Sequence, residues 1–368
     1  MRFPEFSGEW KMCTIGELTT KVGSGVTPRG GEAVYKIEGH PFVRSQNVGL
    51  GNLLLDDIAF IDEETHLRQK NTELQFNDVL LNITGASIGR SALVDKQIVG
   101  GNVNQHVCII RTKENLVPSF ICSFLLSNYG QRQIDSFQAG GNRQGLNFEQ
   151  IKSIKITIPS KDEQIKIAKL LRAIDERIAT QNKIIDKLQS LIKGIAQNVA
   201  RNNKPNIRLS ECLECSSSTL QESDVCKNGT YPVYGANGIV GYLDNYNTEK
   251  EAVYIIKDGS GVGTVSYVTG KCSATGTLNT LQAKEGYSLQ YLYYMLKVFN
   301  FEPYKTGMAI PHIYFKDYGK AKIFCPSYTE QLKYARLLSA IDNKLSAEQS
   351  ILTDLSLQKQ YLLRQMFI

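Results

Sequence analysis

The sequence lacks most of the short motifs that mark catalytic or nucleotide-binding sites. It contains neither a G-x-x-x-x-G-K-[ST] phosphate loop nor a G-x-G-x-x-G dinucleotide loop. All ten prolines are isolated, which excludes the Asn/Asp/Ser-Pro-Pro-aromatic loop of amino-methyltransferases. The four histidines are scattered, without the H-E-x-x-H spacing of zinc hydrolases. The sequence therefore contains no recognisable catalytic motif, although spacing alone does not exclude a site that folding assembles from distant carboxylates.

Cysteine pairs and long apolar runs are also scarce. Of the eight cysteines, Cys212 and Cys215 form a lone C-x-x-C without a second pair, so we predict free thiols rather than a structural zinc site. The longest weakly polar run, Val117 to Leu126, is shorter than the roughly 20 residues of a membrane span. The first residues show no basic region followed by an apolar core, as a secretory signal would. We therefore expect a cytoplasmic protein in a reducing compartment.

A large excess of charge of one sign is missing as well. The 368 residues include 42 basic and 36 acidic side chains, which gives a formal net charge of +6. The surplus lies mainly in residues 159–204, with a net charge of +5, whereas residues 1–158 and 205–325 are neutral. This balance permits a polyanionic partner without demanding one. The length predicts two or three domains, and the hydrophobic fraction of 42% is typical of chains that fold around apolar cores.

What the sequence does contain is an internal duplication. Residues 159–175 read PSKDEQIKIAKLLRAID and residues 326–342 read PSYTEQLKYARLLSAID, with 11 of 17 positions identical at an offset of 167. Further upstream, VLLNITGASIG from Val79 matches VYIIKDGSGVG from Val253 at an offset of 174. The openings at Ile15 and Leu209 match at an offset of 194. The copies are thus most alike at their rear, which predicts two similar mounts that carry two different heads.

Each repeated rear segment predicts a long helix. Its apolar residues recur at alternating steps of three and four, which is the heptad pattern of a coiled-coil seam. Each helix could extend over about 38 residues, or roughly 57 Å. Gln181 and Glu348 occupy equivalent seam positions, where they would either fix the helix register or mark a solvated stretch. The predicted seam comprises Leu171, Ile174, Ile178, Ile185, Leu188 and Ile192 in the first copy and Leu338, Ile341, Leu345, Leu352, Leu355 and Leu362 in the second.

The fronts of the two copies predict mixed domains built on sheets. Of the 30 glycines, only Gly194 lies in either predicted helix. Short β-branched runs, such as Val79 to Ile83, alternate with turn residues in both fronts. We predict an α+β fold in which two mixed α/β domains are separated by two long helices that form an antiparallel coiled coil, with pseudo-twofold symmetry from the duplication. The predicted boundaries are 1–158, 159–204, 205–325 and 326–368.

Polar loops in both fronts carry side chains suited to reading DNA bases. In the major groove Arg pairs with guanine, and Asn or Gln pairs bidentately with adenine. Glycines beside these side chains allow the backbone to approach phosphates closely. For any one residue the competing interpretation is a surface turn or a local hydrogen bond. The candidates are Arg29, Arg44, Gln46, Asn47, Asn104, Gln105, His106, Arg143 and Gln144 in the first front and Asn237, Lys257, Asn279, Lys305 and His312 in the second.

The arrangement as a whole resembles the specificity subunits of type I DNA restriction–modification systems. The resemblance covers essentially the whole chain and rests on the repeated P-S-x-x-E-Q-x-K-x-A-(K/R)-L-L-x-A-I-D segment, the loop from Gly23 to Pro28 and the stretch from Tyr231 to Gly238. It implies that each front is a target-recognition domain that reads one half of a split double-stranded DNA sequence. It also implies that the helices act as a ruler between the half-sites and dock two modification subunits.

The same resemblance implies where the chemistry takes place. In that family the modification subunits bind S-adenosylmethionine and methylate adenine, and restriction subunits with motor and nuclease activity join them, with ATP and Mg²⁺ on those partners. The chain itself is then expected to hold no cofactor or metal, to have no catalytic residue and to contact no membrane.

Two other functions remain open at this stage. A fused nuclease or methyltransferase with unrecognised motifs would cleave or methylate DNA as the isolated chain, given a divalent metal or S-adenosylmethionine. A protein-binding scaffold would grip polypeptides with its heads and would show no salt-sensitive binding to DNA. The bases that are read do not follow from the sequence, because loop geometry sets the pairing.

Overall fold

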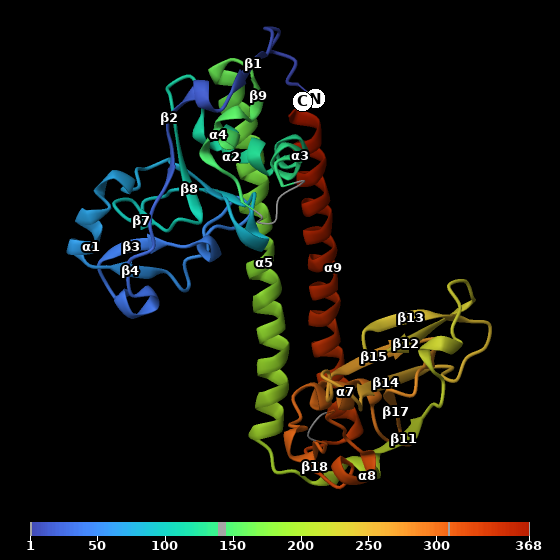
Figure 1. Ribbon diagram of the computed structural model, residues 1–368. Helices are drawn as coiled ribbons and strands as arrows, with labels where there is room; N and C mark the ends of the chain where they lie inside the picture. The colour runs from blue at the N-terminus through green and yellow to red at the C-terminus, as the bar shows by residue number, and fades with distance from the viewer. Residues whose placement is uncertain (1, 139–144, 308–309, 368) are drawn as a thin grey trace. The chain divides into compact units, whose positions relative to one another are not determined.

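The computed structural model describes residues 2–138, 145–307 and 310–367. The chain divides into two compact units (Figure 1): unit 1 comprises residues 1–181 and 351–368, and unit 2 comprises residues 182–350. Two long helices, α5 (Lys161–Arg201) and α9 (Tyr328–Met366), are divided between the units. The first half of α5 and the last part of α9 belong to unit 1, and the rest of both helices belongs to unit 2. We call residues 1–158 head 1 and residues 205–325 head 2. Among the described helices, none combines the length and apolar character needed to cross a membrane.

Head 1 is built on two sheets and a short strand pair. The strand pair joins β1 near the start of the head to β9, which leads directly into α5. The central strand of the larger sheet, β5, is buried along its whole length. In the three-stranded sheet, β3 and β7 are parallel, whereas all other pairs are antiparallel. The four-stranded order is β2–β8–β5–β6 (Thr19–Ser24, Val107–Thr112, Val79–Asn82, Ser91–Leu93), the three-stranded order is β4–β3–β7 (Ala59–Ile61, His40–Val43, Asn102–Val103), and β1 (Lys11–Thr14) pairs with β9 (Lys155–Ile158).

The helices of head 1 attach it to the halves of α5 and α9 in the same unit. Helix α2 begins with Pro118, a residue favoured at the first helical position because it has no N–H to satisfy there. The ring of Phe367 lies 5.1 Å from that of Phe120 and 5.9 Å from that of Phe124, so the end of α9 closes the core of head 1. In Figure 1, α2 and α3 lie beside the helix pair, and the β3–β4–β7 sheet lies on the far side of the head. The helices are α1 (Glu63–Arg68), α2 (Pro118–Leu126), α3 (Asn128–Ser136) and α4 (Phe148–Ser153).

Head 2 repeats this plan strand for strand. Its four-stranded sheet, its three-stranded sheet with one parallel pair and its short strand pair correspond in order to those of head 1. The orders are β11–β17–β14–β15 (Leu213–Ser217, Leu278–Ala283, Glu251–Ile256, Val265–Thr269) and β13–β12–β16 (Gly238–Leu243, Tyr231–Gly235, Ser273–Ala274), and β10 (Ile207–Arg208) pairs with β18 (Lys322–Ile323). The helices are α6 (Leu209–Cys212), α7 (Leu289–Lys297) and α8 (Phe315–Tyr318).

The two long helices pack antiparallel along the predicted seam. In unit 1 the first half of α5 packs against the last part of α9, where Lys359 Nζ lies 2.6 Å from Asp175 Oδ1. In unit 2 the second half of α5 and the first half of α9 border one cavity. The predicted fold class is thereby confirmed. Of the seam residues, Leu171, Ile174, Ile185, Ile192, Leu338, Leu345, Leu355 and Leu362 are buried, and Ile178, Leu188, Ile341 and Leu352 are half-buried.

The repeated Glu-Gln pair explains how each head is fixed to its helix. Gln164 is buried, its Oε1 accepts the N–H of Val117 at 2.9 Å and its Nε2 donates to Pro159 O at 3.0 Å. Gln331 makes the same two bonds in unit 2, with Ser288 N at 2.9 Å and Pro326 O at 2.9 Å. Because Val117 and Ser288 are the residues that precede α2 and α7, each glutamine satisfies a backbone donor where a head helix begins.

Candidate nucleic-acid interface

The polar loops of head 1 meet at one edge of its four-stranded sheet. The end of β2 and the end of β5 both lie beside the start of β8, because Ser24 pairs with Cys108 and Asn82 pairs with Val107. The loops that leave these strand ends therefore gather at the same edge. They are residues 25–29 after β2, residues 83–90 after β5 and residues 104–106 before β8. We call this group of loops the head 1 edge.

Gln105 and His106 lie in a chain of hydrogen bonds across the head 1 edge. Gln105 Oε1 accepts the N–H of Thr27 at 3.0 Å and also the Thr27 hydroxyl. Gln105 Nε2 lies 3.0 Å from His106 Nε2, and His106 Nδ1 lies 2.6 Å from Thr84 Oγ1. These hydrogen bonds thus connect all three loops. Gln105 is exposed and His106 is half-buried, so the amide lies at the surface of the edge.

The loop after β3 is organised by Asp57, a residue that no local sequence pattern marks as part of the site. Arg44 Nη2 donates to the Asp57 backbone oxygen at 2.6 Å and lies 3.3 Å from Oδ2. Asn47 is fully buried, and its Nδ2 donates to Asp57 Oδ1 at 3.0 Å and to Leu54 O at 2.9 Å. The amide of Gln46 also donates to Asp57. The three predicted residues are therefore brought together around Asp57. The buried amide of Asn47, however, bonds within the loop and is not exposed to a ligand.

The other predicted residues of head 1 fall into three environments. Asn104 is buried, and its Oδ1 accepts the N–H of His106 at 3.0 Å, which shapes the turn before β8. Arg29 is exposed in the loop after β2. Arg143 and Gln144 lie outside the described residues.

Head 2 presents a corresponding edge with different side chains. Its loops also leave the end of β14 and the start of β17, where Ile256 pairs with Leu278. His312 Nδ1 lies 2.6 Å from Asp258 Oδ1, and the N–H of Ile313 donates to Lys257 O at 2.9 Å. Lys257 and His312 are thus adjacent. Lys305 lies on the same loop as His312, with its Nζ 2.6 Å from Glu302 Oε1.

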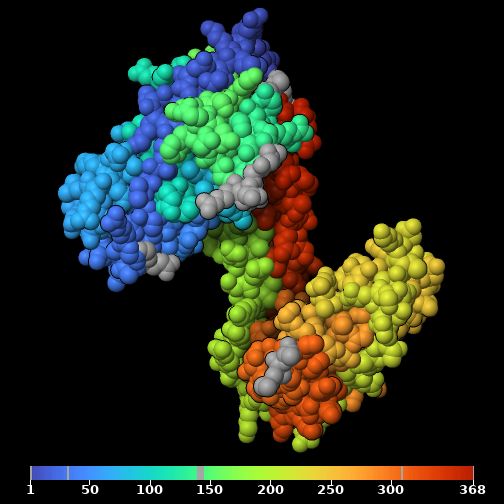
Figure 2. All heavy atoms as spheres, viewed as in Figure 1, coloured from blue at the N-terminus to red at the C-terminus, as the bar shows by residue number. Residues whose placement is uncertain are grey.

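Asn279 and Asn237 lie apart from this pair. Asn279 is buried, its Nδ2 donates to Tyr318 O–H at 3.0 Å and its Oδ1 accepts from Ser217 Oγ at 3.2 Å, so it serves the interior of head 2. Burial raises the pKa of the Tyr318 hydroxyl, which keeps it protonated. Asn237 is exposed at the turn between β12 and β13. Figure 2 shows the surface of this hairpin (yellow) at the outer side of head 2.

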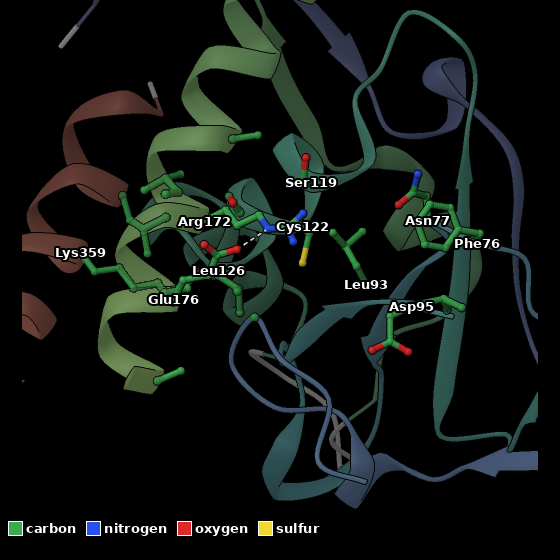
Figure 3. Close-up of a pocket in the computed structure, with 18 residues that line it drawn as sticks. Phe76, Asn77, Leu93, Asp95, Ser119, Cys122, Leu126, Arg172, Glu176 and Lys359 are labelled. Atoms are coloured by element: carbon green, nitrogen blue, oxygen red, sulfur yellow. Dashed lines mark hydrogen bonds and ion pairs between the residues drawn. The ribbon is translucent and has the colours of Figure 1, made fainter. Parts of the chain in front are cut away.

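A cavity lies where each head meets the helix pair of its own unit. In unit 1 a cavity of about 470 Å³ is bordered by Cys122 and Leu126 of α2, by α5 and by α9 (Figure 3). Arg172 Nε donates to Glu176 Oε1 at 2.9 Å beside it. Asp175, whose partner is Lys359, is the last residue of the repeated segment.

Unit 2 has a cavity of about 460 Å³ in the corresponding place, between α7, α5 and α9. Asp342, the repeat equivalent of Asp175, lines it and accepts the Tyr294 hydroxyl at 3.3 Å. Ile192 of α5 lies at the position equivalent to Lys359. The duplication has therefore preserved the cavity and its aspartate but changed the partner of that aspartate.

Both heads carry polar loops at the same edge of a sheet. Both are also fixed to a long helix by the same buried glutamine. These features together define a two-headed recognition protein. The model of the family described as type I restriction modification DNA specificity domain matches residues 7–190 and again residues 205–356. The chain belongs to this family. The function predicted from the sequence, DNA recognition for a type I restriction–modification system, is confirmed at this level.

Similar proteins carry the same description. A putative type I specificity subunit of Mycoplasma genitalium is 25% identical over 320 residues, which are 79% of this chain and 81% of that protein. The putative MjaX specificity subunit of Methanocaldococcus jannaschii is 22% identical over 53% of this chain and 46% of that protein. The crystal structure of the S subunit from M. genitalium matches 100% of this chain and 97% of its own with a TM-score of 0.68 at 18% identity, which supports the shared fold.

Proposed function

We propose that head 1 and head 2 each read one half of a bipartite double-stranded DNA target, and that α5 and α9 set the unspecified spacer between the halves. The observation that carries this proposal is the repetition of a polar loop edge on the same sheet in both heads. The family match, which covers each copy separately, supports it. A duplicated reader fits a target with two half-sites better than a single continuous site.

The chain recognises DNA and leaves the chemistry to its partners. Two modification subunits dock on the helical parts, and they supply S-adenosylmethionine and methylate adenine; restriction subunits supply ATP- and Mg²⁺-dependent translocation and cleavage. The paired cavities at the repeated Asp175 and Asp342 support two docking positions for two copies of one partner. A solved chain of similar fold, with a TM-score of 0.56, belongs to a structure that describes complex assembly of the type I R-M system.

The distribution of charge supports DNA binding that is divided between this chain and its modification subunits. Both heads have a net charge of zero, whereas residues 159–204 carry +5. Because phosphate contacts supply much of the affinity for DNA, neutral heads bind weakly by themselves. The free chain therefore depends on its modification subunits for tight binding, and the loop edges contribute selectivity.

Exchange of one head tests this function directly. Residues 1–158 are replaced by the head of another specificity subunit, the chain is expressed with its modification subunits, and methylated adenines are mapped across the host genome. We expect one half of the target to change while the other half and the spacer stay the same. A change in both halves, or cleavage or methyl transfer by the purified chain alone, would contradict the proposal.

A further inference from the structure

The two heads hold one loop position in the same backbone setting. In head 1 the N–H of Ile83 donates to His106 O at 3.0 Å, and the N–H of Leu146 donates to Ile83 O at 2.8 Å. In head 2 the N–H of Lys257 donates to Thr277 O at 3.0 Å, and the N–H of Ile313 donates to Lys257 O at 2.9 Å. These bonds make Ile83 equivalent to Lys257. The next residues, Thr84 and Asp258, are therefore the same position of the fold with different side chains.

The hydrogen bonds of head 1 fix which groups stay available. Gln105 Oε1 faces the N–H of Thr27, which can only donate, so Nε2 must be the atom that faces His106. His106 Nε2 then accepts, and the proton of the neutral ring lies on Nδ1, which donates to Thr84 Oγ1. Among the residues that the structure describes, no partner is bonded to the second N–H of Gln105 or to the O–H of Thr84. The head 1 edge thus offers two donors to a ligand.

Head 2 offers an acceptor at the equivalent position. His312 Nδ1 donates to Asp258 Oδ1 at 2.6 Å, and among the described residues no further side chain bonds to Asp258 Oδ2. The Asp258 side chain is 35% exposed, so a ligand can reach this side chain. An ionised carboxylate has no proton to donate. At the same loop position, the Thr84 hydroxyl can thus donate a hydrogen bond to a ligand, whereas the Asp258 carboxylate can only accept one.

We propose that this position and the side chain linked to it determine sequence specificity, through Thr84 and Gln105 in head 1 and through Asp258 in head 2. The free N–H of Gln105 requires an acceptor, which in the major groove is O6 or N7 of guanine, N7 of adenine or O4 of thymine. Asp258 requires a donor, which in the major groove is the exocyclic amino group of cytosine or adenine. This inference rests on the proposed function, because it assumes that the loop edges face DNA bases.

Isosteric substitutions test the assignment in the complex with the modification subunits. Gln105→Glu replaces the amide donor with an acceptor, and Asp258→Asn adds a donor where only an acceptor stood. Methylation is measured with S-adenosylmethionine on a library of duplexes that varies every base of the target. For Gln105→Glu we expect the preference for one base at one position of the first half to fall about tenfold or more, and the library identifies which acceptor base is read there. For Asp258→Asn we expect an equal loss at one position of the second half, and the library identifies whether cytosine or adenine is read there.

Matched controls separate recognition from folding. Gln97→Glu makes the same change at an exposed turn of head 1, and Glu285→Gln makes an acid-to-amide change after the opposite end of β17; both should keep the full target. Thr84→Val removes the second donor of head 1 and should weaken base selectivity in the first half of the target only. If Gln105→Glu loses its native circular dichroism, Gln105→Met, which keeps the volume without the amide, replaces it.

The outcomes distinguish this inference from the function beneath it. An unchanged target in folded Gln105→Glu, Thr84→Val and Asp258→Asn complexes would overturn the inference and leave the bipartite reader intact. A wild-type complex that methylates without regard to sequence would overturn the proposed function itself.

Discussion

At the scale of single residues, the thiols show how strongly the interior of this protein controls chemistry. Burial raises the pKa of Cys108 to about 12 and that of Cys122 to about 11, whereas Cys226 is exposed. Since only the thiolate reacts with alkylating agents, a raised pKa removes reactivity at any pH below it.

We therefore expect iodoacetamide at pH 8 to label Cys226 and to leave Cys108 and Cys122 unmodified in the folded protein. At pH 8, a thiol of pKa about 11 is ionised in roughly one molecule per thousand. Peptide mass spectrometry after timed labelling measures this, and labelling in denaturant provides the control. Fast modification of Cys108 without denaturant would show that its strand, β8, opens readily.

Residue types and their spacing predicted Gln105, His106 and Lys257 as candidates, but not the groups that hold them. Thr27 lies 78 residues from Gln105 in the sequence. Asp57 accepts hydrogen bonds from three side chains that lie ten or more residues before it. Such partners follow from strand pairing, which local patterns do not encode. The same patterns also selected Asn47 and Asn279, whose amides the fold turns inward.

At the scale of elements, the long helices were the most predictable part of the chain. Their 3–4 periodicity is a local signal, and α5 and α9 extend over 41 and 39 residues. The short strands were predicted mainly where β-branched residues cluster, as in β5 and β14. Their order in the sheets could not be predicted, because pairing joins segments that are far apart in sequence.

The helix lengths give a prediction at this scale. Insertion of one heptad into both α5 and α9 preserves the phase of the seam and lengthens the pair by about 10 Å. Since DNA rises about 3.4 Å per base pair, we expect the spacer in the methylated target to grow by about three base pairs while both half-sites stay the same.

Genome-wide mapping of methylated adenines measures the new spacer. A heptad in α5 alone is the control, because it leaves the antiparallel helices unequal in length and should reduce methylation rather than shift the spacer. An unaltered spacer with both insertions would contradict the role of the helices as a ruler.

At the scale of the whole molecule, the two fronts share one topology although their sequences diverge. The changing offsets of 194, 174 and 167 mark places where head 2 has shorter connections between the same elements. Ile15 and Leu209 open the least similar stretch of the two copies. Each donates a backbone hydrogen bond to the residue just before the last strand of its head, Ile154 before β9 and Ala321 before β18. The backbone plan has therefore outlasted the sequence similarity.

The division into units predicts which part of the molecule depends on the end of α9. Phe367 is buried against Phe120 and Phe124, so Phe367→Ala should destabilise unit 1 by about 3–5 kcal/mol. Hydrogen exchange followed by mass spectrometry should show faster exchange in α2 and little change in β14 of unit 2. Tyr361→Ala, at an exposed site of the same helix, is the control. Equal loss of protection in both units would show that they unfold together.

The discontinuity of unit 1 has a consequence for the order of folding during synthesis. Unit 2 is one continuous stretch of chain, whereas head 1 needs residues 351–368 to complete its core. On the ribosome, the segment translated second can thus reach its native packing before the segment translated first. Until then the apolar face of α2 is uncovered, which makes head 1 the part of the nascent chain that chaperones would have to protect.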